Sequence, residues 1–159
     1  MAIECLEVFA LSEHLHRQFL EAVQVELDNR GLRDINAVRA SILLNIGTAE
    51  MTVSELMYRG CYLGSNVSYN LKKLTETGYV EQVRSMNDKR MIMVKNSAKG
   101  LAICGALTEM TERYSQMLYQ GSVKSDDVKN CRRTLKALQQ LWSRAIEPRS
   151  LGGLAPILG

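Results

Sequence analysis

The chain has 159 residues, 46% of them hydrophobic, and a formal net charge of +3. A chain of this length and composition forms one globular domain, or one domain with long arms, around a buried core. No stretch approaches the roughly 18 apolar residues that a membrane-spanning helix needs, and Glu4, Glu7 and Glu13 interrupt any export signal. We therefore expect a cytoplasmic protein without a membrane partner.

The charged residues are distributed unevenly. Residues 52–99 contain eight Lys or Arg and four acidic residues, whereas residues 1–51 contain four Arg and eight acidic residues. Such a positive excess is the electrostatic footprint of a nucleic-acid-binding region, although it also occurs on proteins that bind no nucleic acid. The four cysteines form no Cys-x-x-Cys motif. We therefore expect free thiols, no metal site and no cofactor.

Two helices are predicted at the start of the chain. Apolar residues recur at helical spacing from about Glu7 to Asn29, and Gly31 ends this helix. Asn36 is the expected N-cap of a second helix, which Gly47 ends. The expected apolar face of the second helix is Val38, Ile42, Leu43 and Ile46.

A helix-turn-helix pattern follows. Thr52 and Glu55 form a Thr-x-x-Glu capping box that opens a short third helix. Two glycines within residues 59–64 permit a tight turn, and a fourth helix is expected over residues 65–77, ended by Gly78. The side chains expected to be buried in these two helices are Leu56, Met57, Val67, Leu71 and Leu74.

Two strands and two long helices complete the pattern. Residues 79–83 and 91–94 read as paired strands with a charged tip between them. A fifth helix opens at Ser97 and a sixth follows Gly121, each with an apolar seam at steps of three and four. The seams are Ile103, Leu107, Met110, Tyr114 and Met117 in the fifth, and Val128, Cys131, Leu135, Leu138, Trp142 and Ala145 in the sixth.

These elements predict a mainly α fold with a small β-wing, that is, a winged helix-turn-helix with long N- and C-terminal dimerisation helices. The long seams could pack within one chain, but a small winged domain cannot cover them all, so we expect a homodimer. Residues 1–34 and 101–147 would form the dimerisation region, residues 35–100 the DNA-binding region, and residues 148–159 a tail arm.

The outward face of the fourth helix suits the major groove of duplex DNA, which admits one helix. Ser65, Asn66 and Ser68 can hydrogen-bond base edges or phosphates, and Tyr69 can contact a sugar or a thymine methyl. Lys72 and Lys73 are placed for phosphates, which give affinity without sequence information. The alternative interpretation is a polar face exposed only to solvent.

The hairpin tip suits the minor groove. Asp88 and Arg90 are two residues apart, so the carboxylate can hold and aim the guanidinium. An aimed Arg fits a narrow minor groove, which concentrates negative potential. Asn87 and Lys89 would contact nearby phosphates, and a simple surface ion pair is the alternative.

The layout resembles the MarR family of bacterial regulators. Three segments carry the resemblance: Thr52–Leu56; Val67-Ser68 with Leu71, Leu74 and Gly78–Val80; and Asp88-x-Arg90 followed by Ser97–Gly100. The resemblance implies a two-fold dimer on an inverted-repeat operator, released by a small phenolic or aromatic acid. Overall likeness favours the alphaproteobacterial LdtR branch, which is linked to genes for cell-wall L,D-transpeptidases and stress. Tyr69 stands where many relatives have Arg.

In relatives the effector pocket lies between the dimerisation helices and the winged domain. The corresponding candidates here are His14, His16, Arg17, Phe19 and Arg39. The two histidines do not share one helix face, which argues against a metal pair. Oxidation of Cys61, in the turn before the fourth helix, is an alternative switch.

Two other functions compete with sequence-specific DNA binding. One is a winged-helix module for protein–protein assembly, which would not need the charged tip or the lysine pair. The other is an enzyme, which we do not expect, because the sequence offers no Gly-rich phosphate loop, nucleophile elbow or metal-ligand cluster.

Overall fold

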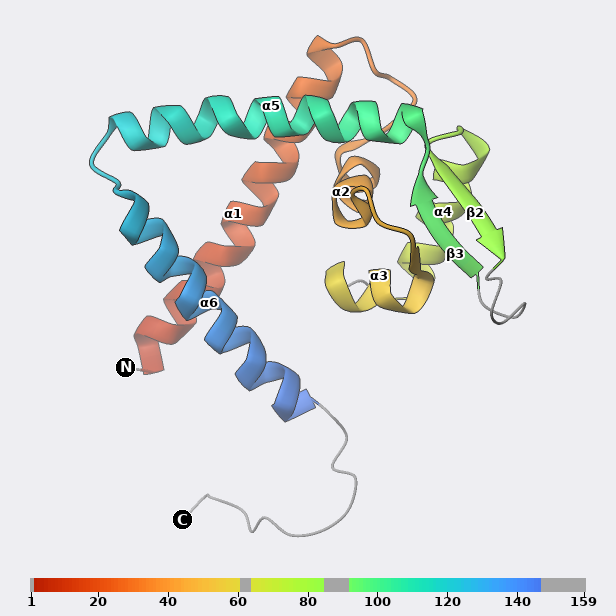
Figure 1. The fold of residues 1–159 in the computed structure, drawn as a ribbon. Coiled ribbons are helices and arrows are strands. Elements are labelled where there is room, and N and C mark those ends of the chain that lie inside the picture. The colour runs from red at the N-terminus through yellow and green to blue at the C-terminus, as the bar shows by residue number, and fades with distance from the viewer. Residues whose placement is uncertain (1, 61–63, 85–91, 147–159) are drawn as a thin grey trace, which may run out of the picture. The chain divides into compact units, whose positions relative to one another are not determined.

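The computed structural model describes residues 2–60, 64–84 and 92–146. Six helices and three short strands follow one another in this part of the chain (Figure 1). The predicted mainly α fold with a small β-wing is confirmed. The elements are α1 (Ala2–Asn29), α2 (Ala37–Ile46), β1 (Met51–Thr52), α3 (Val53–Gly60), α4 (Gly64–Glu76), β2 (Val80–Arg84), β3 (Ile92–Asn96), α5 (Ala98–Gln120) and α6 (Ser125–Ile146).

The chain divides into two compact units, Met1–Glu112 and Arg113–Gly159. The first unit holds the helix-turn-helix, the sheet, α1 and the first part of α5. The second holds the end of α5 and all of α6. The first helix begins earlier than the sequence predicted, at Ala2.

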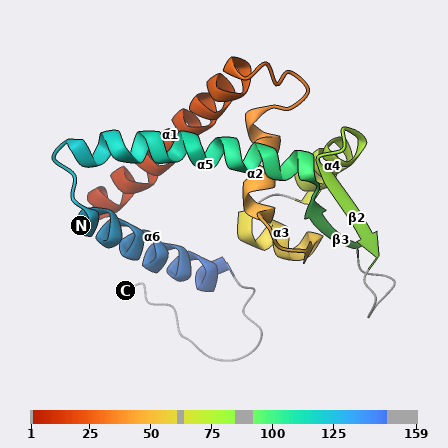
Figure 2. The same cartoon turned by 45° about the horizontal axis from the view of Figure 1, so that its top comes forward.

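The sheet has three antiparallel strands in the order β1-β3-β2. The pair β2 and β3 can be followed in Figure 2. Val94 in β3 pairs with Met51 on one side and Gln82 on the other. The strand β1 was not predicted, because two residues are too few to show an alternating pattern. Its Met51 is buried, so this short strand ties the start of α3 to the sheet.

The core of the first unit joins α1, α2, α3, α4, the sheet and α5. Its largest fully buried side chains include Leu27, Leu43, Leu56, Leu74, Tyr79, Leu107 and Met110. Met57 packs against this core but is only partly buried. The prediction for Val38 was wrong, since 41% of it is exposed. Ala37 and Ala40 are buried on α2 instead, and they shift the buried face of this helix away from Val38.

Both predicted helix caps are present. The side chain of Asn36 accepts a hydrogen bond from the Arg39 N–H at 3.0 Å. The Thr52 N–H donates to Glu55 Oε2 at 2.7 Å, and the Glu55 N–H donates to Thr52 Oγ1 at 3.1 Å. This reciprocal pair satisfies donors that the start of α3 leaves free. The hydrogen bond from the Thr52 backbone also lowers the pKa of Glu55.

Two close contacts fix the start of α5. The amide of Asn96 is buried and donates to the carbonyl oxygens of Leu43 at 2.9 Å and Gly47 at 2.8 Å. Gly100 packs so tightly against the Tyr79 carbonyl that a Cβ there would overlap the oxygen. These contacts lock α5 to the end of α2 and to the start of β2.

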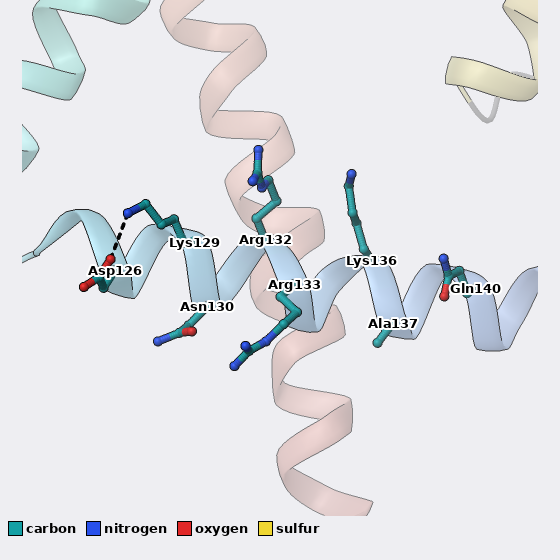
Figure 3. Close-up of a pocket in the computed structure, with 8 residues that line it drawn as sticks. All are labelled: Asp126, Lys129, Asn130, Arg132, Arg133, Lys136, Ala137 and Gln140. Carbon is teal, nitrogen blue, oxygen red and sulfur yellow. Dashed lines mark hydrogen bonds and ion pairs between the residues drawn. The ribbon is translucent and has the colours of Figure 1, made fainter.

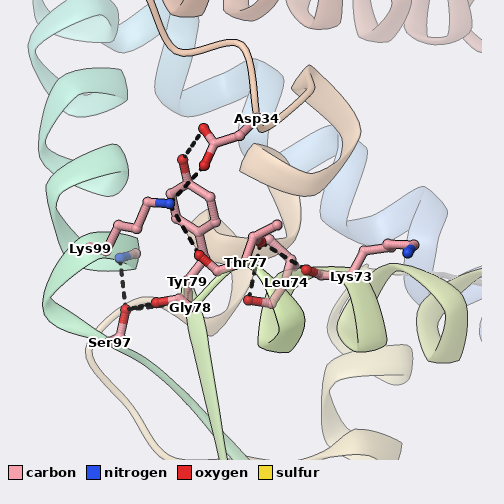
Figure 4. A network of polar contacts seen from close by, with 9 residues as sticks. Asp34, Lys73, Leu74, Thr77, Gly78, Tyr79, Ser97 and Lys99 are labelled. Atoms are coloured by element: carbon pink, nitrogen blue, oxygen red, sulfur yellow. Dashed lines mark hydrogen bonds and ion pairs between the residues drawn. The ribbon is translucent and has the colours of Figure 1, made fainter.

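A polar network joins three segments at the same place (Figure 4). The Tyr79 hydroxyl donates to Asp34 Oδ1 at 2.7 Å, and Lys99 Nζ lies 2.7 Å from Asp34 Oδ2. The ammonium of Lys99 also lies 3.9 Å from the centre of the Tyr79 ring. Asp34 thereby links the segment before α2 to the end of the helix-turn-helix and to α5.

We expect this network to make stability depend on pH. The hydrogen bond from Lys99, and then that from Tyr79, lower the pKa of Asp34 below its ordinary value of 3.8. A carboxylate with a lowered folded-state pKa stabilises the protein above its ordinary pKa, and this contribution is lost as pH falls through the folded value. In urea unfolding, the free energy of unfolding of wild type should exceed that of Asp34→Asn most near neutral pH. This difference should shrink below about pH 4. A difference that is constant over this range would contradict the assignment.

Candidate nucleic-acid interface

One side of α4 holds the helix against the core. Val67, Leu71 and Leu74 are buried, as their spacing predicted. At the C-terminal end, the Tyr79 N–H donates to the Leu74 carbonyl at 2.8 Å, and Gly78 has φ of +75°. This left-handed conformation favours glycine and allows the chain to turn directly into β2. The wing strands therefore begin at the end of α4.

The opposite side of α4 is polar. Ser65, Asn66, Ser68, Tyr69 and Lys72 are exposed there. A helix with one buried apolar side and one exposed polar side can lie in a groove without disturbing its own packing. The geometry thus presents five of the six predicted helix contacts to solvent on a rigid element.

The sixth, Lys73, is partly buried and differs from its neighbour. Its Nζ lies 2.8 Å from Glu76 Oε2, whereas Lys72 Nζ is 4.0 Å from the other oxygen. The hydrogen bond with Glu76 raises the pKa of Lys73 and lowers that of Glu76. A phosphate would compete with Glu76 for Lys73, so Lys72 is the freer cation.

The wing is formed by β2 and β3. The pairing runs from Val80 with Asn96 to Arg84 with Ile92. Each strand is shifted by one residue relative to its predicted start, and β3 continues to Asn96. The predicted contacts of the tip, Asn87, Asp88, Lys89 and Arg90, lie outside the described residues.

Sequence reasoning missed one residue of α4, Asn70. Asn70 is 7% exposed, and its Nδ2 donates to the Asn66 carbonyl at 2.9 Å. Its Oδ1 accepts from Arg39 Nε on α2 at 3.3 Å. Asn70 follows Asn66 by four residues, which places it beside the inward face and could have indicated burial.

The comparisons with known proteins agree with this geometry. Residues 35–100 match a family model described as a winged helix DNA-binding domain. The exopolysaccharide II synthesis transcriptional activator ExpG of Rhizobium meliloti is 34% identical over 139 residues, which cover 87% of this chain and 72% of ExpG.

Solved structures share the fold. Streptococcus pneumoniae FabT, in complex with DNA, has a TM-score of 0.70 at 20% identity, over 88% of this chain and 98% of FabT. A mutant MarR from E. coli, complexed with operator DNA, has a TM-score of 0.67 at 24% identity, over 85% and 95% of the two chains. The chain belongs to the MarR family. It is a winged-helix DNA-binding transcriptional regulator of the MarR type.

The candidates for a MarR-type effector pocket do not gather into one described site. His14, His16 and Arg17 are exposed on α1, and Phe19 is a partly buried residue packed against the core. Arg39 lies on α2 and bonds to Asn70. The pocket itself stays a prediction.

A hollow described in the structure lies elsewhere, along α6 (Figure 3). One helix supplies its whole lining, including the cations Lys129, Arg132, Arg133 and Lys136. Lys129 Nζ lies 2.9 Å from Asp126 Oδ1. An open basic helix face can attract anions without enclosing one, so this hollow does not supply an enclosed effector site.

The remaining chemistry of the described residues is limited. Cys104 is half-buried, and burial raises the pKa of its thiol, which disfavours the reactive thiolate. Cys61, the predicted redox candidate, lies outside the described residues. Over residues 2–60, 64–84 and 92–146, no group of His, Cys, Asp and Glu is arranged to hold a metal. None of the helices in that part of the chain is long and apolar enough to cross a membrane.

Proposed function

We propose that this MarR-family protein binds an inverted-repeat operator in a sequence-specific way as a homodimer. The observation that carries the proposal is the polar side of α4, exposed opposite its buried apolar side. Ser65, Asn66 and Ser68 near the helix start would reach base edges, while Lys72 would contact a phosphate. The tip residues Asn87 to Arg90 would follow the neighbouring backbone and minor groove.

Exposed apolar side chains on the long helices support the homodimer. In α1, Ile3 is 73% exposed and Leu11 is 66% exposed. In α5, Met117 is 66% exposed, and in α6, Leu141 is 61% exposed. Large apolar side chains that stay exposed on long helices in this way are candidates for burial against a partner chain. Two-fold symmetry would then place two α4 helices in successive major grooves, about 34–36 Å apart or a multiple of that distance.

A small aromatic or phenolic acid is the proposed effector. The likeness to MarR-type regulators supports this proposal, and the exposed cation Arg17 on α1 could pair with the carboxylate of such an acid. An acid bound there would be detected by its release of the protein from DNA. Control of cell-wall L,D-transpeptidase and stress genes stays a prediction, and the activator ExpG makes exopolysaccharide synthesis genes a second group to test.

Fluorescence anisotropy tests the proposed function. The full-length protein is titrated onto a labelled duplex from upstream of its own gene and onto a scrambled duplex, at two salt concentrations. Tight binding that prefers the native duplex and weakens with salt would support a sequence-specific regulator. Absence of binding to both duplexes at low salt would contradict DNA binding and favour the assembly-module alternative.

Asn66→Ala should reduce discrimination between sequences. An Asn amide that pairs with an adenine edge contributes about 1–3 kcal/mol of discrimination, and the proposed dimer carries two, so the preference for the native duplex should fall by about 30-fold or more. Lys72→Ala is the matched control on the same exposed face, because loss of a phosphate contact weakens binding to both duplexes equally. If Asn66→Ala also weakened both duplexes equally, Asn66 would not read a base.

A further inference from the structure

Arg39 is a residue of α2 that lies beside α4, the helix proposed to enter the major groove. Its Nε donates to Asn70 Oδ1 at 3.3 Å, across the contact between α2 and α4. Asn70 is 7% exposed and is itself fixed by its bond to the Asn66 carbonyl. A buried amide with both ends engaged is a rigid anchor, so it restricts the direction of the Arg39 side chain.

The anchor sits on the flank of the polar face of α4. Residues 66, 70 and 73 follow each other at steps of four and three, so they form one row along the helix. Asn70 is the middle of this row, between the exposed Asn66 and the partly buried Lys73. Arg39, bound to the middle position, therefore adds a cation to the edge of the face that would enter the groove.

The positive charge of Arg39 affects Lys73, the last residue of this row. The bond with Glu76 raises the pKa of Lys73, while the positive charge of Arg39 acts in the opposite direction as a smaller effect. The two cations are thus close enough to interact. Among the described residues, no hydrogen-bond acceptor or carboxylate is bound to Nη1 or Nη2 of Arg39, which leaves these donors for a ligand.

We propose that Arg39 is a DNA-phosphate contact supplied by α2 and aimed by the buried amide of Asn70. A recognition helix in the major groove is flanked by phosphates of both strands, and a guanidinium can hold a phosphate through two parallel N–H donors. The Nε of Arg39 is used to fix its direction, and the two Nη groups are used to bind. This inference rests on the proposed DNA binding. It assigns Arg39 to DNA and not to the effector pocket for which the sequence made it a candidate.

The salt dependence of DNA binding tests the proposal. Arg39→Gln keeps an N–H donor for Asn70 but removes the charge. Each lost phosphate contact reduces the slope of log K against log salt by about 0.9, so a dimer with two Arg39 residues should lose about 1.8. Between 50 and 200 mM salt, wild-type affinity should then fall about tenfold more than that of Arg39→Gln, on the native and scrambled duplexes alike.

Two further variants separate this role from a structural one. Arg39→Lys keeps the charge and should recover most of the wild-type slope. Arg33→Gln removes an exposed cation from the segment before α2 and should leave the slope unchanged. Thermal melting of each variant, followed by circular dichroism, reports any loss of folding separately from the slope.

The outcomes are distinct. If Arg39→Gln keeps the wild-type slope, the inference is overturned, even if the affinity falls. Arg39 would then affect binding by positioning α4 and not by contacting a phosphate. An equal slope loss in Arg33→Gln also overturns it, since the effect would be one of net charge. If the wild-type protein binds neither duplex at low salt, the proposed function itself fails.

Discussion

Replacing Gly100 by alanine is expected to lower the free energy of unfolding by about 2–3 kcal/mol. The new Cβ would overlap the Tyr79 carbonyl oxygen, which is a backbone atom and cannot rotate away. It would also come within 3.3 Å of the Asn96 side chain. Relief would require α5 to move away from the start of β2. Urea unfolding followed by circular dichroism would measure the loss.

The matched control is Gly105→Ala in the same helix. A Cβ at Gly105 meets nothing within 4 Å. Alanine is a better helix former than glycine by about 1 kcal/mol, so this variant should be as stable as wild type or more stable. Equal tolerance of alanine at both positions would show that α5 is not locked at Gly100.

Replacing Asn96 by alanine is expected to cost about 2 kcal/mol of stability. The amide nitrogen of Asn96 donates to the carbonyl oxygens of Leu43 and Gly47 at the end of α2. The Leu43 oxygen keeps its bond from the Gly47 N–H, but the Gly47 oxygen loses its amide partner. The buried Oδ1 of Asn96 has no hydrogen-bond partner, so its removal offsets part of the cost. The loss would be measured by thermal and urea unfolding.

Asn96→Asp sharpens this test because it keeps the shape and removes the donors. A carboxylate would face two carbonyl oxygens in a buried site, so the variant should lose more stability at pH 7 than near pH 4. A variant whose stability did not depend on pH in this range would show that position 96 is open to water. That result would contradict the role that we assign to the buried amide of Asn96 in holding the end of α2.

The sequence was most informative where a local rule determines structure. The Thr52–Glu55 capping box, the Asn36 cap and the left-handed Gly78 involve residues within a few positions of each other. The inward row of Val67, Leu71 and Leu74 follows from helix periodicity alone. These features are enough to predict the helix-turn-helix and the exposed polar face of α4.

The features that were missed depend on contacts between distant segments. The strand β1 exists because Met51 pairs with Val94 in β3, which no local pattern reveals. Val38 fits the helical period of its neighbours, yet the small side chains of Ala37 and Ala40 occupy the buried side. The role of Arg39 depends on Asn70, which follows 31 residues later. Long-range packing thus decided each of these positions.

The junction between the wing and α5 has a mechanical consequence. Only Ser97 separates the end of β3 from the start of α5, and its N–H and hydroxyl bond to the Tyr79 and Gly78 carbonyls. The first turns of α5 are therefore fixed directly to the C-terminal end of α4, without a hinge between them. In the proposed homodimer, a tilt of these turns would carry the recognition helix with it. A small rotation at the dimerisation helices would then change the distance between the two α4 helices of the dimer. Because the spacing of successive major grooves is fixed, only some of these distances would allow both helices to bind.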